Sequence, residues 1–298
     1  MSEHKVILLD GGMGQELLRR SGDVPHPMWS TQVMIDHPDV VLGLHADYIL
    51  AGADVITLNA YTITPERLAR DGDEGEFSRL QKVAIDIAHE ARSKAGVDSV
   101  RIAGCLPPLV GSYRPDQAPE ASVMLATYRQ IVAAQKNHVD LFLCETMSSI
   151  EEAMTAATAA LESGLPVWVS MSVKDDDQRQ LRSGEQLSDA ITRLKTLPLQ
   201  ATLLNCSKPE AITAAWDDLS NSTGLIGAYA NGFTSISALD PGGTVDALSA
   251  RHDLSPENYA KLVMQWVERG ADIVGGCCEV GPDHIAKIAQ QLKAQSRH

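Results

Sequence analysis

The chain has 298 residues, of which 44% are hydrophobic and 21% charged, and its 25 basic and 39 acidic side chains give a net charge of −14. This size suits one large barrel or two ordinary domains, and the acidic balance argues against nucleic acid or an anionic membrane surface as the main partner. No apolar run approaches the ~18 residues of a transmembrane helix, so we expect no membrane span. Because the first five residues lead directly into a strand and not into a signal peptide, we expect a cytoplasmic protein with reduced thiols.

Short apolar strands alternate with amphipathic helices along the chain. Most of the strands are rich in Val, Ile or Leu with little polar alternation, which is typical of strands buried on both faces. The predicted strands cover residues 6–9, 55–58, 101–105, 141–144, 167–170, 202–205, 225–228 and 273–275. The predicted helices include residues 38–50, 77–95, 122–136, 150–162, 184–194, 256–268 and 282–294, with Ser255 as a cap and Gly52, Gly96, Gly164 and Gly270 at C-terminal ends.

Eight strands, each followed by a helix, predict a single (β/α)8 TIM-type barrel over residues 1–298, with the active site at the C-terminal ends of the strands. An open doubly wound sheet is the alternative. It would normally carry a Gly-x-Gly-x-x-Gly turn, which residues 10–16 (Asp-Gly-Gly-Met-Gly-Gln-Glu) do not fit. No linker or repeat suggests a second domain. The polar segments 71–76 and 174–184 are predicted surface connections, and the second is placed to cover the active-site face.

Three cysteines lie where predicted strands end. Cys277 and Cys278 follow the eighth strand and two glycines, and Cys206 follows the sixth strand. In a barrel these ends share one face, so the three thiolates predict a zinc site with an open fourth position, as in catalytic sites. A disulfide is the alternative, but the count of five cysteines is odd and no secretory signal is present. We expect Cys105 and Cys144 to be small buried hydrophobes.

Candidate substrate-binding residues lie at other strand ends. Asp10, Gly11 and Gly12 follow the first strand, where glycines leave backbone N–H groups open to a ligand, although a tight turn would also need them. Glu145 follows the fourth strand, and a carboxylate there needs a cation opposite, which the ammonium of an amino acid or an unidentified Arg would supply. Asn231 follows the seventh strand, where asparagine is also common in plain turns.

Trp29 lies in a proline-rich stretch after the first strand and is either an aromatic wall for a cationic methyl donor or a buried loop anchor. His284 is read as a helix residue beside the site and not as a ligand. Three thiolates on zinc make a soft centre that is poorly suited to generating hydroxide. It suits the activation of another thiol as a nucleophile, so the sequence indicates sulfur chemistry on an amino-acid thiol.

Along nearly its whole length the chain resembles the homocysteine S-methyltransferase family. The most specific elements are Asn205-Cys206 together with the Gly-Gly-Cys-Cys of residues 275–278. Weaker ones are residues 10–14 (Asp-Gly-Gly-Met-Gly), 64–68 (Thr-Pro-Glu-Arg-Leu), 145–146 (Glu-Thr) and 229–232 (Tyr-Ala-Asn-Gly).

The resemblance implies a zinc-dependent barrel that transfers a methyl group to L-homocysteine and so makes methionine. Cys206, Cys277 and Cys278 would be the zinc ligands, while the Asp10–Gly12 turn and Glu145 would hold the amino-acid end of homocysteine. Trp29 sits roughly where the betaine-using branch has a pocket tryptophan. The implied reaction is direct displacement, in which the homocysteine thiolate attacks a methyl group on positively charged sulfur or nitrogen.

Some residues depart from the family pattern. Leu58, Asn59 and Ala60 stand where many members have Thr-Asn-Thr, and Glu279 follows the double cysteine. Asn59 remains a candidate substrate-binding residue. The loop 113–120 is short and proline-rich, without the longer insertion of the S-methylmethionine-using enzymes. The methyl donor is therefore open among S-methylmethionine, S-adenosylmethionine and betaine-like compounds.

Two other functions fit the same residues. One is a zinc methyltransferase that acts on a different small thiol, and the other is a non-catalytic zinc- or redox-sensing barrel. The expected partners are small molecules, with no nucleic acid and no membrane, for a monomer or a small homo-oligomer.

Overall fold

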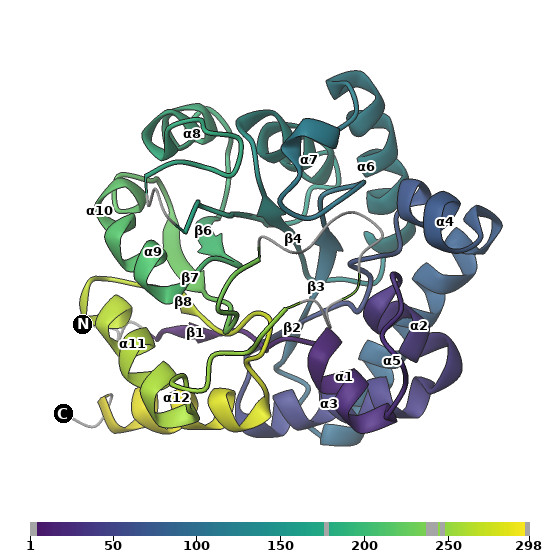
Figure 1. Ribbon diagram of the computed structural model, residues 1–298, viewed down its shortest axis with the longest axis horizontal. Coiled ribbons are helices and arrows are strands. Elements are labelled where there is room, and N and C mark those ends of the chain that lie inside the picture. Colours follow the sequence, from purple (N-terminus) through teal and green to yellow (C-terminus); the bar gives the residue numbers. More distant parts are fainter. Residues whose placement is uncertain (1–4, 176–178, 237–243, 245–247, 296–298) are drawn as a thin grey trace.

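Eight parallel strands form one sheet in the order β1-β8-β7-β6-β5-β4-β3-β2 in the computed structural model, which describes residues 5–175, 179–236, 244 and 248–295. The sheet closes on itself, because Leu9 bridges Val55 in parallel and the Asp54 N–H donates to the Leu8 carbonyl at 2.7 Å. Figure 1 looks along this barrel and shows the helices arranged around it. The predicted (β/α)8 fold is confirmed.

All eight predicted strands are present, with ends that shift by three residues at most. They are β1 (Ile7–Leu8), β2 (Val55–Thr57), β3 (Arg101–Leu106), β4 (Leu141–Met147), β5 (Val167–Met171), β6 (Ala201–Asn205), β7 (Leu225–Tyr229) and β8 (Ile273–Val274). The longest, β4, runs three residues beyond its predicted end and carries an irregularity in its pairing with β5 between Cys144 and Met147. Such a bulge re-aims a side chain, and here it falls at Glu145.

The helices confirm the predicted alternation and add several short elements. They are α1 (Gly14–Ser21), α2 (Trp29–Asp36), α3 (Pro38–Ala51), α4 (Pro65–Asp71), α5 (Phe77–Ala95), α6 (Ala121–Gln135), α7 (Ile150–Leu161), α8 (Leu187–Leu194), α9 (Pro209–Ala214), α10 (Trp216–Leu219), α11 (Pro256–Glu268) and α12 (Pro282–Gln295), with 3₁₀ turns at Glu74–Glu76 and Pro115–Gln117. None of the described helices combines the length and the apolar character needed to cross a membrane.

The ends of the helices follow local chemistry. Ser255 accepts a hydrogen bond from the Asn258 N–H at the start of α11, and Gly52 and Gly96 end α3 and α5 with φ of 109° and 68°. Helix α8 begins three residues later than predicted, since Gly184 lies in a turn with φ of 94°. Residues 176–178 of the predicted loop 174–184 and residues 1–4 at the start of the chain lie outside the described residues.

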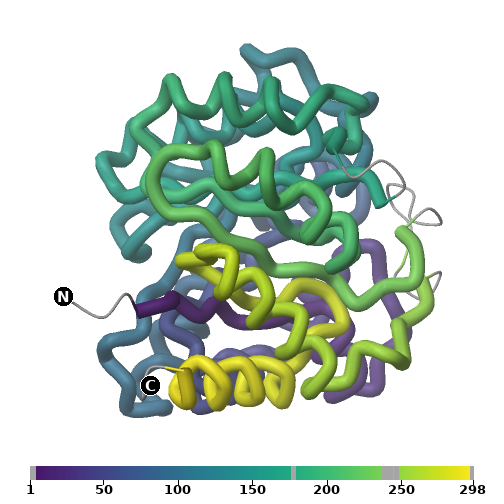
Figure 2. The backbone as a smooth tube through the Cα atoms, turned by 90° about the vertical axis from the view of Figure 1, so that its left-hand side faces the viewer, coloured from purple at the N-terminus to yellow at the C-terminus, as the bar shows by residue number. Residues whose placement is uncertain are grey.

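The core has two layers. Side chains that point inward fill the barrel, among them Trp168, Leu143 and Tyr229, and a larger apolar layer lies between the strands and the helices. In Figure 2 the purple strand β1 lies beside the yellow C-terminal segments, and Ile7 indeed pairs with Ile273 of β8. The loops after β1 and β8 therefore meet at the C-terminal end of the barrel.

Candidate metal centre and substrate pocket

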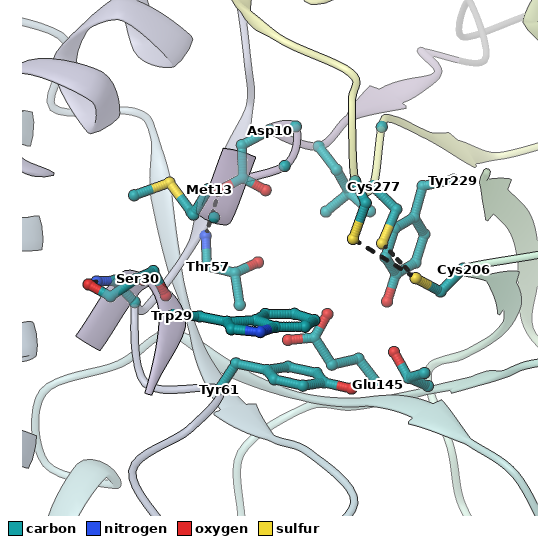
Figure 3. Close-up of a pocket in the computed structure, with 18 of the residues that line it drawn as sticks. Asp10, Met13, Trp29, Ser30, Thr57, Tyr61, Glu145, Cys206, Tyr229 and Cys277 are labelled. Carbon is teal, nitrogen blue, oxygen red and sulfur yellow. Dashed lines mark hydrogen bonds between the residues drawn. The ribbon is translucent and has the colours of Figure 1, made fainter. Parts of the chain in front are cut away.

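A pocket of about 780 Å³, its open mouth included, lies at the C-terminal end of the barrel and is lined by residues that follow most of the strands. The predicted site residues that line it are Asp10, Gly11, Gly12, Trp29, Asn59, Glu145, Cys206, Cys277 and Cys278. Figure 3 shows the sulfur atoms of Cys206 and Cys277 on one side and the stacked rings of Trp29 and Tyr61 on another. Of the predicted metal-binding and substrate-binding residues, Asn231 alone is not in this lining.

The three thiols converge on one point. The Sγ atoms of Cys206 and Cys277 are 3.0 Å apart, those of Cys206 and Cys278 are 3.9 Å apart, and all three lie within 4.8 Å of one another. All five cysteines are free thiols. Because Cys277 and Cys278 donate S–H hydrogen bonds to it, the pKa of the Cys206 thiol lies well below its ordinary value. One thiolate is therefore already favoured in the cluster.

This donor set fits a zinc ion. Tetrahedral coordination with zinc–sulfur bonds of about 2.3 Å puts ligand sulfurs about 3.8 Å apart, which falls within the observed spread of separations. Cys277 and Cys278 are partly exposed to the pocket, whereas Cys206 is buried. Three thiolates that face a cavity leave the fourth position to a ligand from that cavity.

Two pairs of glycines hold the cysteine loop against the end of β1. A Cβ atom on Gly12 would lie 2.5 Å from the Cys277 carbonyl oxygen, and one on Gly11 would lie 2.1 Å from the Val280 carbonyl oxygen. On the other side, a Cβ on Gly275 would meet Leu9 at 2.5 Å. The glycines are therefore required by close approach of two backbones, and the Gly12 N–H, which we expected to face a ligand, donates to Val280 at 2.9 Å.

A pair of buried side-chain hydrogen bonds ties β4 to β6 beside the pocket. The amide of Asn205 accepts from the Thr146 N–H and donates to the Thr146 hydroxyl, both at 2.9 Å. The neighbours of this pair in sequence are Glu145 and Cys206, so one contact fixes the carboxylate relative to a thiol. Both residues belong to the family motifs in the sequence, but no role for either follows from the sequence alone.

Strained backbone is concentrated at this site. The described non-glycine residues with left-handed φ are Trp29 (44°), Tyr113 (62°), Thr146 (62°), Cys206 (48°) and Glu279 (65°). The first four line the pocket and the fifth follows Cys278. Such conformations cost of order 1–3 kcal/mol each and persist only where the surroundings impose them, which is typical of functional sites.

Two carboxyl groups face the pocket with raised pKa values. Burial raises the pKa of Asp10 to about 8, although its carboxylate accepts the Thr57 N–H at 2.8 Å. Burial also raises the pKa of Glu145 to about 7, against a hydrogen bond from the Cys105 thiol that lowers it. No arginine pairs with Glu145 among the residues that the structure describes. Both groups are therefore short of a cation, which a ligand can provide.

An aromatic stack forms another wall. The rings of Trp29 and Tyr61 are parallel within 6°, with centroids 6.2 Å apart, and the Arg67 guanidinium lies 5.3 Å from the Tyr61 centroid on a buried side chain. Trp29 thus lines the pocket and is partly exposed, whereas the alternative was a buried loop anchor. Tyr61 was missed in the sequence, because nothing local distinguishes it from a core tyrosine.

Tyr113 contacts the thiol cluster directly. Its hydroxyl lies 2.9 Å from Cys206 Sγ, and the Arg182 guanidinium lies 5.3 Å from its ring centroid. Arg182 also donates to the Cys206 carbonyl at 3.3 Å, so the described part of the loop 174–184 does reach the site. No local sequence pattern indicates Tyr113, since the loop 113–120 stands out only as short and proline-rich.

The remaining candidates lie outside the pocket lining. Asn231 is buried, and its side-chain oxygen accepts the Phe233 N–H at 3.2 Å, as in a plain turn, while its side-chain nitrogen has no hydrogen-bond partner among the described residues. Glu279 points to helix α1 and pairs with Arg19 at 3.0 Å. His284 is a residue of α12 whose ring bonds the backbone of Gly281 and Leu254, as expected of a non-ligand. Leu58 is the exception, since it lines the pocket, while Ala60 is buried and is not part of the lining.

Comparison with known proteins gives a consistent result. A family model described as homocysteine S-methyltransferase matches residues 7–292. The homocysteine S-methyltransferase of Escherichia coli K12 is 30% identical, over 99% of this chain and 97% of that protein. The homocysteine S-methyltransferase YbgG of Bacillus subtilis 168 is 27% identical over 97% and 95% of the two chains. The metallated crystal form of the Escherichia coli homocysteine methyltransferase MmuM superposes with a TM-score of 0.81 at 26% identity, covering 97% of each chain.

The fold, the pocket and these similarities define a methyltransferase built on a TIM-type barrel. More narrowly, the chain belongs to the homocysteine S-methyltransferase family.

Proposed function

We propose that this protein transfers a methyl group from a sulfonium or quaternary ammonium donor to the thiol of L-homocysteine, giving methionine, in a zinc-dependent reaction. The observation that carries the proposal is the convergence of three thiols within 4.8 Å on a pocket that also holds two cation-seeking carboxyl groups. S-methylmethionine, S-adenosylmethionine and betaine-like compounds are the candidate donors. Reduced thiols are essential to this chemistry, so we place the protein in the cytoplasm, acting on small molecules.

The amino-acid end of homocysteine is matched by Glu145, Asp10 and helix α1. The two carboxylates would accept the α-ammonium group, whose positive charge favours their ionised forms. The α-carboxylate would face the first turn of α1, where Gly14 and Gln15 line the pocket and the backbone N–H groups have no partner within the helix. Among the residues that the structure describes, the buried Gln15 amide nitrogen has no hydrogen-bond partner, which supports a ligand contact there.

Cys206, Cys277 and Cys278 would hold the zinc ion, which when bound lowers the pKa of the substrate thiol and so presents it as a thiolate. Asp10 and Glu145, in binding the other end of homocysteine, direct its thiol toward these cysteines. The surrounding residues restrict water, because Cys206, Tyr229 and Thr146 are all almost fully buried. A thiolate is a stronger nucleophile in such a site than in bulk water, because less solvent must reorganise during the attack.

The methyl donor is matched by the Trp29–Tyr61 stack. A positively charged sulfur or nitrogen is attracted to the face of an aromatic ring, and both residues line the pocket opposite the cysteines. In the reaction a lone pair of the substrate sulfur forms the new S–CH₃ bond. The bond from the methyl carbon to the cationic sulfur or nitrogen breaks, and its electron pair stays on the leaving atom. The homocysteine thiol would release its proton to solvent before this step, so the step itself needs no protein base.

Two alternative functions can be weighed against specific observations. A different small thiol would suit the same three cysteines, but an acceptor without an α-ammonium leaves Asp10 and Glu145 unmatched. A redox-sensing role is favoured by the short distance of 3.0 Å between Cys206 and Cys277. It predicts zinc release on mild oxidation and no methionine from any donor.

The test is methionine formation by zinc-loaded protein, given homocysteine and each of the three donors separately. We expect methionine from one class of donor, and much slower methylation of cysteine or of a thiol that lacks the amino-acid end. The matched control is the same protein after zinc removal and reconstitution. If zinc-loaded protein makes no methionine with any donor, the homocysteine assignment is wrong, and zinc release on oxidation would then favour the sensor.

A further inference from the structure

Cys105 is a fully buried thiol on β3 that does not line the pocket, and it touches a residue that does. Its Sγ donates a hydrogen bond to Oε1 of Glu145 at 3.1 Å. Among the described residues it is the one hydrogen-bond donor to this carboxylate. The burial of Cys105 in the apolar layer agrees with the small buried hydrophobe that the sequence led us to expect, and the structure adds a hydrogen bond from its thiol to a carboxyl group.

The backbone of Cys105 is held by a buried amide. The Gln135 side chain of α6 accepts from the Cys105 N–H at 2.9 Å and donates to the Cys105 carbonyl at 3.4 Å. Its nitrogen also donates to Gln81 of α5 at 2.8 Å, and Gln81 in turn donates to the Ile63 carbonyl at 2.9 Å. A chain of hydrogen bonds therefore runs from the helix layer through β3 to the pocket.

The residues beside Cys105 and Glu145 leave space for this chain of hydrogen bonds. A Cβ atom on Gly104 would lie 2.7 Å from the Gln135 side-chain oxygen, so glycine lets the amide reach the strand. Glu145 itself lies in the irregular part of β4, where regular pairing with β5 is interrupted. Since the local backbone does not impose a regular strand geometry, a side-chain contact is needed to set the direction of the carboxylate.

We propose that Cys105 is a positioning residue, which fixes Oε1 of Glu145 and leaves Oε2 to the ammonium group of the acceptor substrate. The inference rests on the proposed function, in which Glu145 binds that ammonium. Burial and the nearby Glu145 charge raise the pKa of Cys105 well above its ordinary value, so the thiol keeps its proton and stays a donor at neutral pH. An apolar residue here would leave a buried carboxylate oxygen without a partner.

The first test compares Cys105→Ala with Cys144→Ala. Both thiols are fully buried and Cys144 adjoins Glu145 in sequence, but no hydrogen bond joins it to that carboxylate among the described contacts. We expect Cys105→Ala to raise the KM for homocysteine about tenfold, with kcat and the KM for the donor changed much less. Cys105→Ser retains a donor and restores most of the affinity, and Cys144→Ala leaves the KM for homocysteine near its original value. Equal effects of the two alanine variants would overturn the inference.

A second test needs no activity. The infrared S–H stretching band of Cys105 in the intact protein is assigned by its loss in Cys105→Ser, and that of Cys144 by its loss in Cys144→Ala. We expect Glu145→Gln to shift the Cys105 band, because a neutral amide is a weaker acceptor than a carboxylate, and to leave the Cys144 band in place. An unshifted Cys105 band would overturn the positioning role. A shifted band in a protein that makes no methionine would instead contradict the proposed function alone.

Discussion

The pocket has two walls that are held by different means. The thiol wall, made of Cys206, Cys277 and Cys278, is set by backbone geometry: Gly12 packs against the Cys277 carbonyl, and Cys206 has a left-handed φ of 48°. The carboxylate wall, made of Asp10 and Glu145, is set by hydrogen bonds from the Thr57 N–H and the Cys105 thiol. Cysteine side chains are short, so the position of the backbone decides where the sulfur atoms lie. Aspartate and glutamate side chains can instead be oriented by a single hydrogen-bond donor.

The largest expected effect is at the thiol wall, from Cys277→Ala. With one of three metal ligands removed, we expect zinc to be lost and methyl transfer to fall by at least about a thousandfold. Metal content and methionine formation are measured on the same preparation. Retention of stoichiometric zinc with full turnover would show that these cysteines are not the functional metal site.

The next change tests the backbone of the same wall. A methyl group on Gly12 would clash with the Cys277 carbonyl, so Gly12→Ala should displace the cysteine loop and cost about 1–3 kcal/mol of the free energy of unfolding, together with zinc affinity. Gly43→Ala is the matched control, because among the described residues nothing outside its own stretch of helix lies within 4 Å of the added carbon, and alanine favours the helix α3. Chemical denaturation and metal titration check both variants. Equal stability of the two would contradict the close approach of the loops.

The carboxylate wall is tested by pH. Asp10 keeps its proton up to about pH 8 in the folded protein but loses it near pH 4 when unfolded, so the free energy of unfolding falls as pH rises through this window. Asp10→Asn removes this contribution and can still accept the Thr57 N–H. The free energy of unfolding of the variant, relative to that of the original protein, should be on the order of 1–2 kcal/mol higher at pH 8 than at pH 6. Urea unfolding at the two pH values measures this difference. An unchanged pH dependence would mean that Asp10 is ionised in the folded protein.

The smallest effect concerns the hydroxyl above the thiol wall. Tyr113→Phe removes the contact at 2.9 Å to Cys206 and keeps the ring beneath Arg182. Loss of such an outer partner should lower zinc affinity by about tenfold, measured by competition with a chelator. A loss as large as that of Cys277→Ala would make Tyr113 a ligand in its own right.

The barrel and the thiol wall were predictable because their signals are local. Eight buried apolar runs and cysteines at strand ends are visible without knowledge of distant contacts. The means by which the walls are held were not predictable. Gly11 and Gly12 were expected to leave backbone N–H groups open to a ligand, with a tight turn as the alternative, yet close approach of a backbone more than 260 residues away in the chain requires them. Tyr113 and Cys105 contact residues that are distant in sequence, Cys206 and Glu145 respectively. Asn231 follows a strand at the C-terminal end of the barrel, but its side-chain oxygen bonds the backbone of its own loop.

The placement of the four tryptophans gives the molecule its own optical reporter. Trp168, Trp216 and Trp266 are fully buried, and the last two stack on each other with centroids 6.2 Å apart. Trp29 is partly exposed and lines the pocket. The emission of a single residue therefore responds to what enters the site, while the other three provide a constant background against which binding of a colourless ligand is read.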